Sequence, residues 1–135
     1  MRYLLDTNVC VMYLNGRSDS VRDRLHSISL EEMAVCSIVK AELFHGAMRS
    51  NNPTRTLERQ QIFLASFASL SFDDEAAIVC GQIRARHASV KTPISACDLL
   101  IAAISLANNL TLVTHNTREF RRVDGLQVED WEVEA

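Results

Sequence analysis

The chain has 135 residues, which is enough for one domain with a sizeable core and too few for two, so we expect residues 1–135 to form a single domain. Hydrophobic residues make up 47% of the chain and charged residues 23%, with four glycines and two prolines, and this composition excludes a disordered, fibrous or low-complexity protein. The formal net charge of −3 argues against an overall basic protein, but residues 124–135 hold five acids and no base. The remaining chain has 14 basic and 12 acidic residues, so nucleic-acid binding stays open.

Short apolar runs alternate with longer segments of helical pattern, which predicts strands alternating with helices. In chain order we expect a strand at 3–5, helices at 9–15 and 18–28, a strand at 33–36, a helix at 37–49, a helix opening at 52–53, a strand at 70–72, a helix at 73–87, a break at 92–94, a helix at 95–108, a strand at 110–114, a helical turn at 117–120 and an edge strand at 126–128. The strands are continuously apolar, which indicates a parallel sheet covered by helices on both faces. Ligands in such α/β folds bind beyond the carboxyl ends of the strands, where Asp6 and Asn116 are expected to lie.

The sequence has the features of a cytoplasmic protein. It contains no apolar run of about 18 residues, the length that a transmembrane helix needs. Asp6 interrupts the N-terminal apolar stretch too early for a signal peptide. Cys10, Cys36, Cys80 and Cys97 lie far apart and beside apolar residues, which favours reduced core cysteines over disulfides or a zinc site.

Three acidic residues, Asp6, Glu42 and Asp98, interrupt apolar sequence. Asp6 is the only charged residue in positions 3–16, Asp98 is the only one in positions 92–117, and Glu42 lies on a helix that is expected to be largely buried. Because an unpaired buried carboxylate is costly, a shared divalent cation would stabilise all three. We therefore expect their oxygens to converge within one coordination sphere.

The two aspartates also have a structural explanation that needs no ligand. Asp6 is placed to cap a helix, and Asp98 is placed in the first turn of another, where acids are favoured. Glu42 does not fit this explanation, because it lies five residues beyond the expected cap Ser37. Oxygen ligands without clustered His or Cys favour Mg²⁺ or Mn²⁺ over zinc, and such sites serve phosphodiester cleavage.

Four sequence blocks resemble PIN-domain ribonucleases, specifically the VapC toxins. They are Leu5-Asp6-Thr7-Asn8, Ser37-Ile38-Val39-x-Ala41-Glu42-Leu43-x-x-Gly46, Pro93-Ile94-x-x-x-Asp98-x-x-Ile101-Ala102-Ala103 and Leu112-Val113-Thr114-His115-Asn116-Thr117-Arg118-Glu119-Phe120. The resemblance implies a three-layer α/β/α sandwich with a central parallel sheet of four to five short strands. It also implies Mg²⁺- or Mn²⁺-dependent endoribonuclease activity, a homodimer, and silencing by a VapB-like antitoxin.

The resemblance carries over to individual residues. Asp6, Glu42 and Asp98 match the family's three core acids, which implies catalytic and metal-binding roles for them. Many relatives have a fourth acid at the position of Asn116, and Glu119 is the nearest acid that can take its place. We therefore include Glu119 among the expected catalytic residues.

Several polar residues border these acids. Thr7, Asn8, Ser37 and Asn116 are candidates to orient the ligands or to hold water on the metal, or else they cap helices. Ser95 stands where the family commonly has glycine, and its side chain is expected to tighten the backbone near Asp98.

The expected substrate is RNA, and structured RNA such as tRNA is favoured by the resemblance. The apolar segment 9–14 and neighbouring helical faces are expected to form a groove for an antitoxin helix, whose cationic tail approaches the acids. A PIN module that binds RNA or protein without cleaving it remains the alternative.

Overall fold

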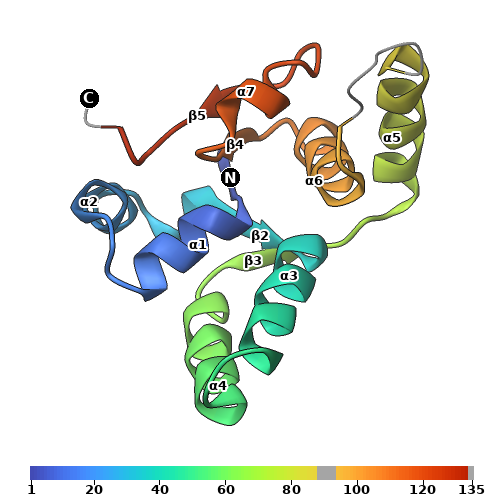
Figure 1. The fold of residues 1–135 in the computed structure, drawn as a ribbon. Coiled ribbons are helices and arrows are strands. Elements are labelled where there is room, and N and C mark those ends of the chain that lie inside the picture. The colour runs from blue at the N-terminus through green and yellow to red at the C-terminus, as the bar shows by residue number, and fades with distance from the viewer. Residues whose placement is uncertain (88–93, 134–135) are drawn as a thin grey trace.

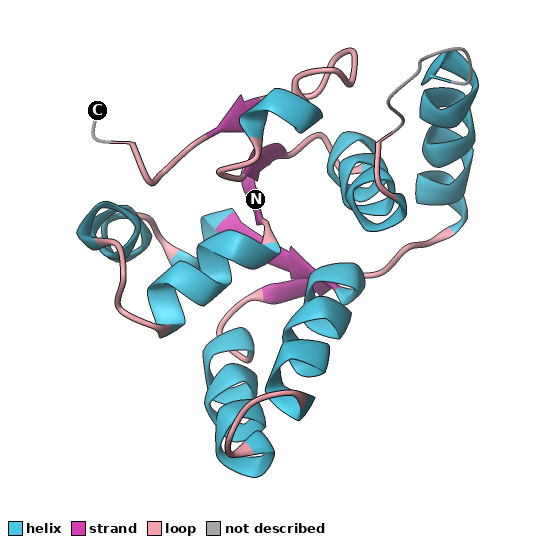
Figure 2. Cartoon of the chain, in the orientation of Figure 1, coloured by secondary structure: helices cyan, strands magenta, loops and turns pink. Residues whose placement is uncertain are grey.

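The sheet of this protein has five parallel strands in the order β3-β2-β1-β4-β5 (Figures 1 and 2). The computed structural model describes residues 1–87 and 94–133. The strands are β1 (Tyr3–Leu5), β2 (Met33–Cys36), β3 (Ala68–Leu70), β4 (Thr111–Val113) and β5 (Val128–Glu129). The parallel sheet expected from the continuously apolar runs is confirmed.

Helices cover both faces of this sheet. They are α1 (Thr7–Leu14), α2 (Asp19–Ser27), the short 3-10 helix η1 (Leu30–Glu32), α3 (Ser37–Met48), α4 (Pro53–Leu64), α5 (Asp74–His87), α6 (Ala96–Ala107) and α7 (Thr117–Phe120). Figure 1 shows α1 and α2 on one side of the sheet, α5 and α6 on the other, and α3 paired with α4. The predicted α/β/α sandwich is therefore confirmed, and none of the described helices is long and apolar enough to span a membrane.

The order in which strands are added to the sheet reverses next to β1. From β1 it proceeds to β2 and β3 on one side, and α5 and α6 then return it so that β4 lies on the other side of β1. Leu5 pairs with Val113, and the backbone N–H of Asp6 donates to the Val113 carbonyl over 2.9 Å. The carboxyl ends of β1 and β4 therefore lie side by side at the position where such folds bind ligands.

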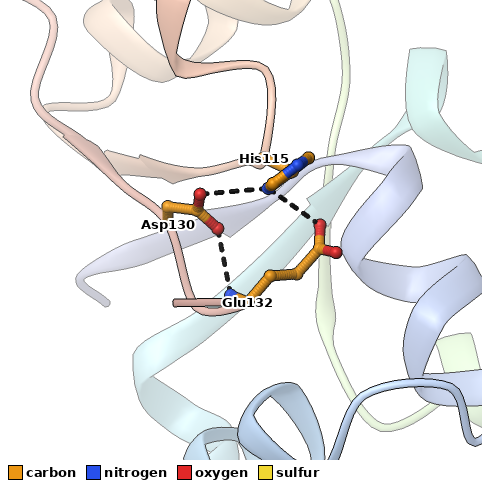
Figure 3. A group of neighbouring side chains, drawn as sticks. All are labelled: His115, Asp130 and Glu132. Carbon is orange, nitrogen blue, oxygen red and sulfur yellow. Dashed lines mark hydrogen bonds and ion pairs between the residues drawn. The ribbon is translucent and has the colours of Figure 1, made fainter. Parts of the chain in front are cut away.

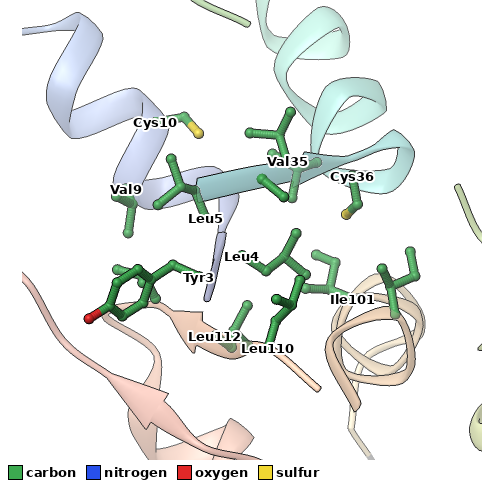
Figure 4. Packing of buried hydrophobic residues seen from close by; sticks show 14 of the residues in the cluster. Tyr3, Leu4, Leu5, Val9, Cys10, Val35, Cys36, Ile101, Leu110 and Leu112 are labelled. Atoms are coloured by element: carbon green, nitrogen blue, oxygen red, sulfur yellow. The ribbon is translucent and has the colours of Figure 1, made fainter. Parts of the chain in front are cut away.

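The central strands are buried on both faces. Leu4, Leu5, Val35 and Leu112 have no exposed surface, and Figure 4 shows them packed between α1 and α6. Burial of large apolar side chains contributes about 1.5–3 kcal/mol each. This rigid centre fixes the ends of β1 and β4 relative to each other.

The predicted bounds were wrong at three places. Strand β3 begins two residues earlier than expected. Its position is set by pairing with β2, in which Ala34 pairs with Ala68 and Cys36 with Leu70. The apolar pattern from which the strand was predicted does not report this register. Strand β5 is shifted to Val128–Glu129. Helix α1 begins at Thr7 because Asp6 caps it. The break predicted at 92–94 lies largely outside the described residues.

The cysteines are all free, as expected, but not all are in the core. Cys10 and Cys36 are buried, Cys80 is half-buried and Cys97 is exposed. The prediction of a core position for Cys97 was wrong, because the first turn of α6 faces solvent at that residue.

Candidate active site

Asp6 follows β1 and is 4% exposed. Its Oδ1 accepts the backbone N–H of Thr7 over 2.8 Å, which caps α1, and its Oδ2 accepts the Thr114 hydroxyl over 2.7 Å. Burial raises the pKa of Asp6 even though these hydrogen bonds act in the opposite direction. Both donors are uncharged, so the ionised Asp6 needs a cation from elsewhere.

Glu42 lies on α3 and is joined to Asp6 through one residue. The Thr7 hydroxyl donates to Glu42 Oε1 over 2.6 Å, while the Thr7 backbone N–H donates to Asp6. The start of α1 therefore holds two carboxylates from distant parts of the chain beside each other.

Asp98, Asn116 and Glu119 form the other half of the site. The Asn116 side-chain N–H donates to Glu119 Oε2 over 2.9 Å and makes a longer contact of 3.4 Å to Asp98 Oδ2. Ser95 caps α6 by accepting the Asp98 N–H, and its own N–H donates to Glu119 Oε1 over 3.0 Å. The side-chain amide of Asn116 therefore connects two of the acids.

Electrostatics couple the two halves. Burial, followed by the contact with Glu119, raises the pKa of Asp98 to about 7. The hydrogen bond with Asp98 lowers the pKa of Glu119. Glu42 and Glu119 both add to the raised pKa of Asp6. The four acids therefore behave as one electrostatic group.

Thr114 is a site residue that sequence reasoning missed. It is fully buried, it donates to Asp6, and its Oγ1 accepts the Asn116 N–H over 3.0 Å. A hydroxyl at the end of the apolar strand 110–114 was the available signal. Asn8 and Ser37 are exposed on the first turns of α1 and α3, so their roles stay predictions.

The residues present fit a divalent cation. The donor set consists of carboxylate oxygens, the buried Asp6 lies among uncharged donors, and the proton on Asp98 is one that a cation would displace. No three of these acids bring ligand atoms within 4.8 Å of one another in the described part of the chain. Among the described residues, the three that bring ligand atoms within 4.8 Å of one another are His115, Asp130 and Glu132. The predicted convergence of Asp6, Glu42 and Asp98 on that scale is not found. Thr7 lies between Asp6 and Glu42 and donates a hydrogen bond to each.

His115, in the loop after β4, contacts Asp130 and Glu132 of the C-terminal segment, and we call these three residues the His115 cluster (Figure 3). His115 Nδ1 lies 3.0 Å from Asp130 Oδ2 and 3.3 Å from Glu132 Oε2, and the Glu132 N–H donates to Asp130 Oδ1 over 3.0 Å. His115 stands between Thr114 and Asn116 in the sequence. We interpret the cluster as a support for the loop that carries these two residues.

We expect cation binding at pH 7 to release protons. Because Asp98 has a pKa of about 7 in the fold, it is roughly half protonated there, and a cation should displace about half a proton from it. The same raised pKa means that the stabilisation present below the unfolded pKa of 3.8 is lost as pH rises through about 7 without a cation. Calorimetric titration with Mn²⁺ in buffers of different ionisation enthalpy measures the release.

The matched control for this measurement is Asp98→Asn, which should reduce the proton release and the fall in melting temperature between acid and neutral pH, leaving the part that comes from the raised pKa of Asp6. Equal heats in all buffers for the natural protein would contradict the prediction.

The fold and the acidic site together define a PIN domain, and the chain matches the PIN domain family over residues 3–126. It is 36% identical over 131 residues to the tRNA(fMet)-specific endonuclease VapC of Salmonella typhimurium, covering 97% of this chain and 98% of that relative. It is 35% identical over 133 residues to Ribonuclease VapC2 of Rickettsia felis, covering 98% and 99%. The crystal structure of DNA-bound VapBC from Salmonella typhimurium matches with a TM-score of 0.90 and 36% identity, covering 97% of this chain and 98% of that one. The chain therefore belongs to the PIN domain family and, within it, to the VapC proteins.

Proposed function

We propose that this protein is an endoribonuclease toxin that requires Mg²⁺ or Mn²⁺ and cleaves structured RNA such as tRNA. The observation that carries the proposal is the group of four acids gathered near the carboxyl ends of β1 and β4, with Glu42 contributed by α3 and Asp98 by α6. The names of the relatives support the reaction and substrate, since one is a tRNA(fMet)-specific endonuclease and another a ribonuclease. Asp6, Glu42, Asp98 and Glu119 are the proposed catalytic residues, and the first three hold the cation.

Each element of the site has a separate task in this mechanism. Thr7 and Thr114 fix both oxygens of Asp6, so that this ligand keeps its orientation. A bound Mg²⁺ or Mn²⁺ would lower the pKa of water and stabilise negative charge on the phosphate. Asp98 would give up its proton to become a ligand of the cation, because a bound cation favours the ionised carboxylate. The N-termini of α1, α3 and α6 carry partial positive charges that favour an anionic phosphate.

RNA cleavage with and without chelator, followed by analysis of the new ends, tests this proposal. The four histidines of the chain are scattered at positions 26, 45, 87 and 115, so a paired acid and base for attack by the 2′-hydroxyl is lacking. We therefore expect a 5′-phosphate and a free 3′-hydroxyl, and loss of cleavage in EDTA that Mn²⁺ restores. A 2′,3′-cyclic phosphate, or full cleavage in EDTA, would overturn the proposed mechanism. Absence of any cleavage would favour the alternative, a PIN module that binds RNA or protein without cleaving it.

We propose that the partner is a VapB-like antitoxin, because solved relatives are VapBC complexes from Salmonella typhimurium and Rickettsia felis. A groove of about 420 Å³ between α1, α2 and α4 suits an amphipathic helix, and its wall includes Tyr13, Phe63 and the exposed Leu30 and Ile62. Addition of the antitoxin encoded by the adjacent reading frame should suppress cleavage in the same assay. The homodimer stays a prediction.

A further inference from the structure

We propose that a second cavity, between α1, α3 and α4, binds a single base of the RNA, the base next to the cleaved phosphodiester. This inference rests on the proposed ribonuclease function and specifies where that function obtains sequence preference. The cavity has a volume of about 230 Å³. Drug-sized ligands occupy pockets of about 300 Å³ or more, so this cavity fits one ring system rather than a helix.

The cavity opens directly on the acidic site. Thr7 and Glu42 line it, and they are the two residues that join the start of α1 to α3 through the 2.6 Å hydrogen bond. A group bound in the cavity would therefore lie next to a phosphate at the acids, as a base does next to its own phosphate.

One wall of the cavity contains a buried polar group without a partner. Gln60 on α4 is 7% exposed, and its Oε1 has no hydrogen-bond partner. Leaving a buried amide oxygen unpaired is unfavourable, so its retention points to a donor that arrives with a ligand. The exocyclic amine or ring N–H of a base is such a donor. The Thr56 hydroxyl supplies a second polar group in the same wall.

Arg59 places a positive charge in the wall of the cavity. Its guanidinium donates to the Leu14 carbonyl over 2.8 Å and lines the cavity. Glu42 lines the same cavity, so its acidic and basic groups offset each other, which suits a neutral base. Arg59 would attract the phosphate beside that base. The apolar side chains of α1 and α3 in the same cavity can contact the flat face of a ring.

Gly46 makes room for the ligand. It lines the cavity from α3, and a Cβ added there would meet no atom within 4 Å. The first atom of a side chain at this position therefore meets no neighbour, and a large side chain there would occupy space at the cavity wall. Gly81 on α5 also has open space around its missing Cβ, and it provides a matched control position.

The test compares ligands that differ only in the base. Dissociation constants are measured with Mg²⁺ for ribose 5-phosphate and the four nucleoside 5′-monophosphates, and the readout is the ratio of the ribose 5-phosphate constant to that of each nucleotide. We expect at least one nucleotide to bind tenfold or more tightly than ribose 5-phosphate. Gly46→Phe and, independently, Gln60→Leu should lower that ratio to about one, while Gly81→Phe should not change it.

Two outcomes would overturn the inference. One is that the natural protein binds all four nucleotides and ribose 5-phosphate alike. The other is that Gly46→Phe keeps the preference for a base but loses binding of N-acetylarginine amide, which would assign the cavity to a protein partner. Failure of the proposed function would look different, because the natural protein would then not cleave RNA in Mn²⁺ whatever its nucleotide preference.

Discussion

We expect Asp6→Asn to lower the rate of RNA cleavage by roughly a thousandfold or more, as removal of a central catalytic group commonly does, while the protein remains folded. Asp6 is the most buried of the four acids and is oriented at both oxygens, so its charge is positioned for a cation more firmly than the others. Asparagine preserves the shape and can still accept the Thr7 N–H. It removes the negative charge on which cation binding depends.

The stability of this variant distinguishes a catalytic role from a merely capping one. Because burial raises the pKa of Asp6, ionisation of this carboxyl is unfavourable in the fold, and Asp6→Asn should not lower the melting temperature in EDTA at neutral pH. Addition of Mn²⁺ should raise the melting temperature of the natural protein and have little effect on the variant.

Asp124→Asn is a suitable control, since it changes an exposed acid outside the site. Cleavage by Asp124→Asn should equal that of the natural protein. Near-normal cleavage by Asp6→Asn, or a large loss of stability in EDTA, would show that Asp6 serves mainly as the cap of α1.

The sequence predicted the sheet and the place of the acids because both depend on local patterns. Continuous apolar runs specify buried parallel strands, and residues that directly follow β1 and β4 must lie at the carboxyl edge. Asp6, Asp98 and Glu42 were recognisable because each interrupts apolar sequence, which is unfavourable without compensation.

What the sequence did not predict depends on contacts between distant segments. The bond from Thr114 to Asp6 spans 108 positions, and the Thr7–Glu42 bond spans 35. No periodicity reports such pairs. The acidic C-terminal segment was likewise treated only as a source of charge, whereas Asp130 and Glu132 contact His115 beside the site.

Trp131 anchors this segment, and we expect Trp131→Ala to destabilise the protein by about 3–5 kcal/mol, the usual cost of truncating a large buried aromatic side chain. Trp131 is the only tryptophan, is 1% exposed, and meets the ring of Tyr3 on β1 edge to face with centroids 5.2 Å apart. From α2, the Arg24 guanidinium lies 5.1 Å from the centroid of the Trp131 ring. The backbone carbonyl of Trp131 accepts the Ser20 hydroxyl, also on α2, over 2.7 Å. The ring therefore joins α2 to the central strand.

Urea denaturation followed by circular dichroism measures this loss without depending on tryptophan fluorescence. Val133→Ala is the matched control, because Val133 belongs to the same segment but is 61% exposed, and it should have a negligible effect. Trp131→Phe keeps a ring against Tyr3 and should lose less than Trp131→Ala. Equal stability of Trp131→Ala and Val133→Ala would contradict the anchoring role.

Since Trp131 lies between Asp130 and Glu132, its loss should also release His115 and weaken cleavage through the loop that holds Thr114 and Asn116.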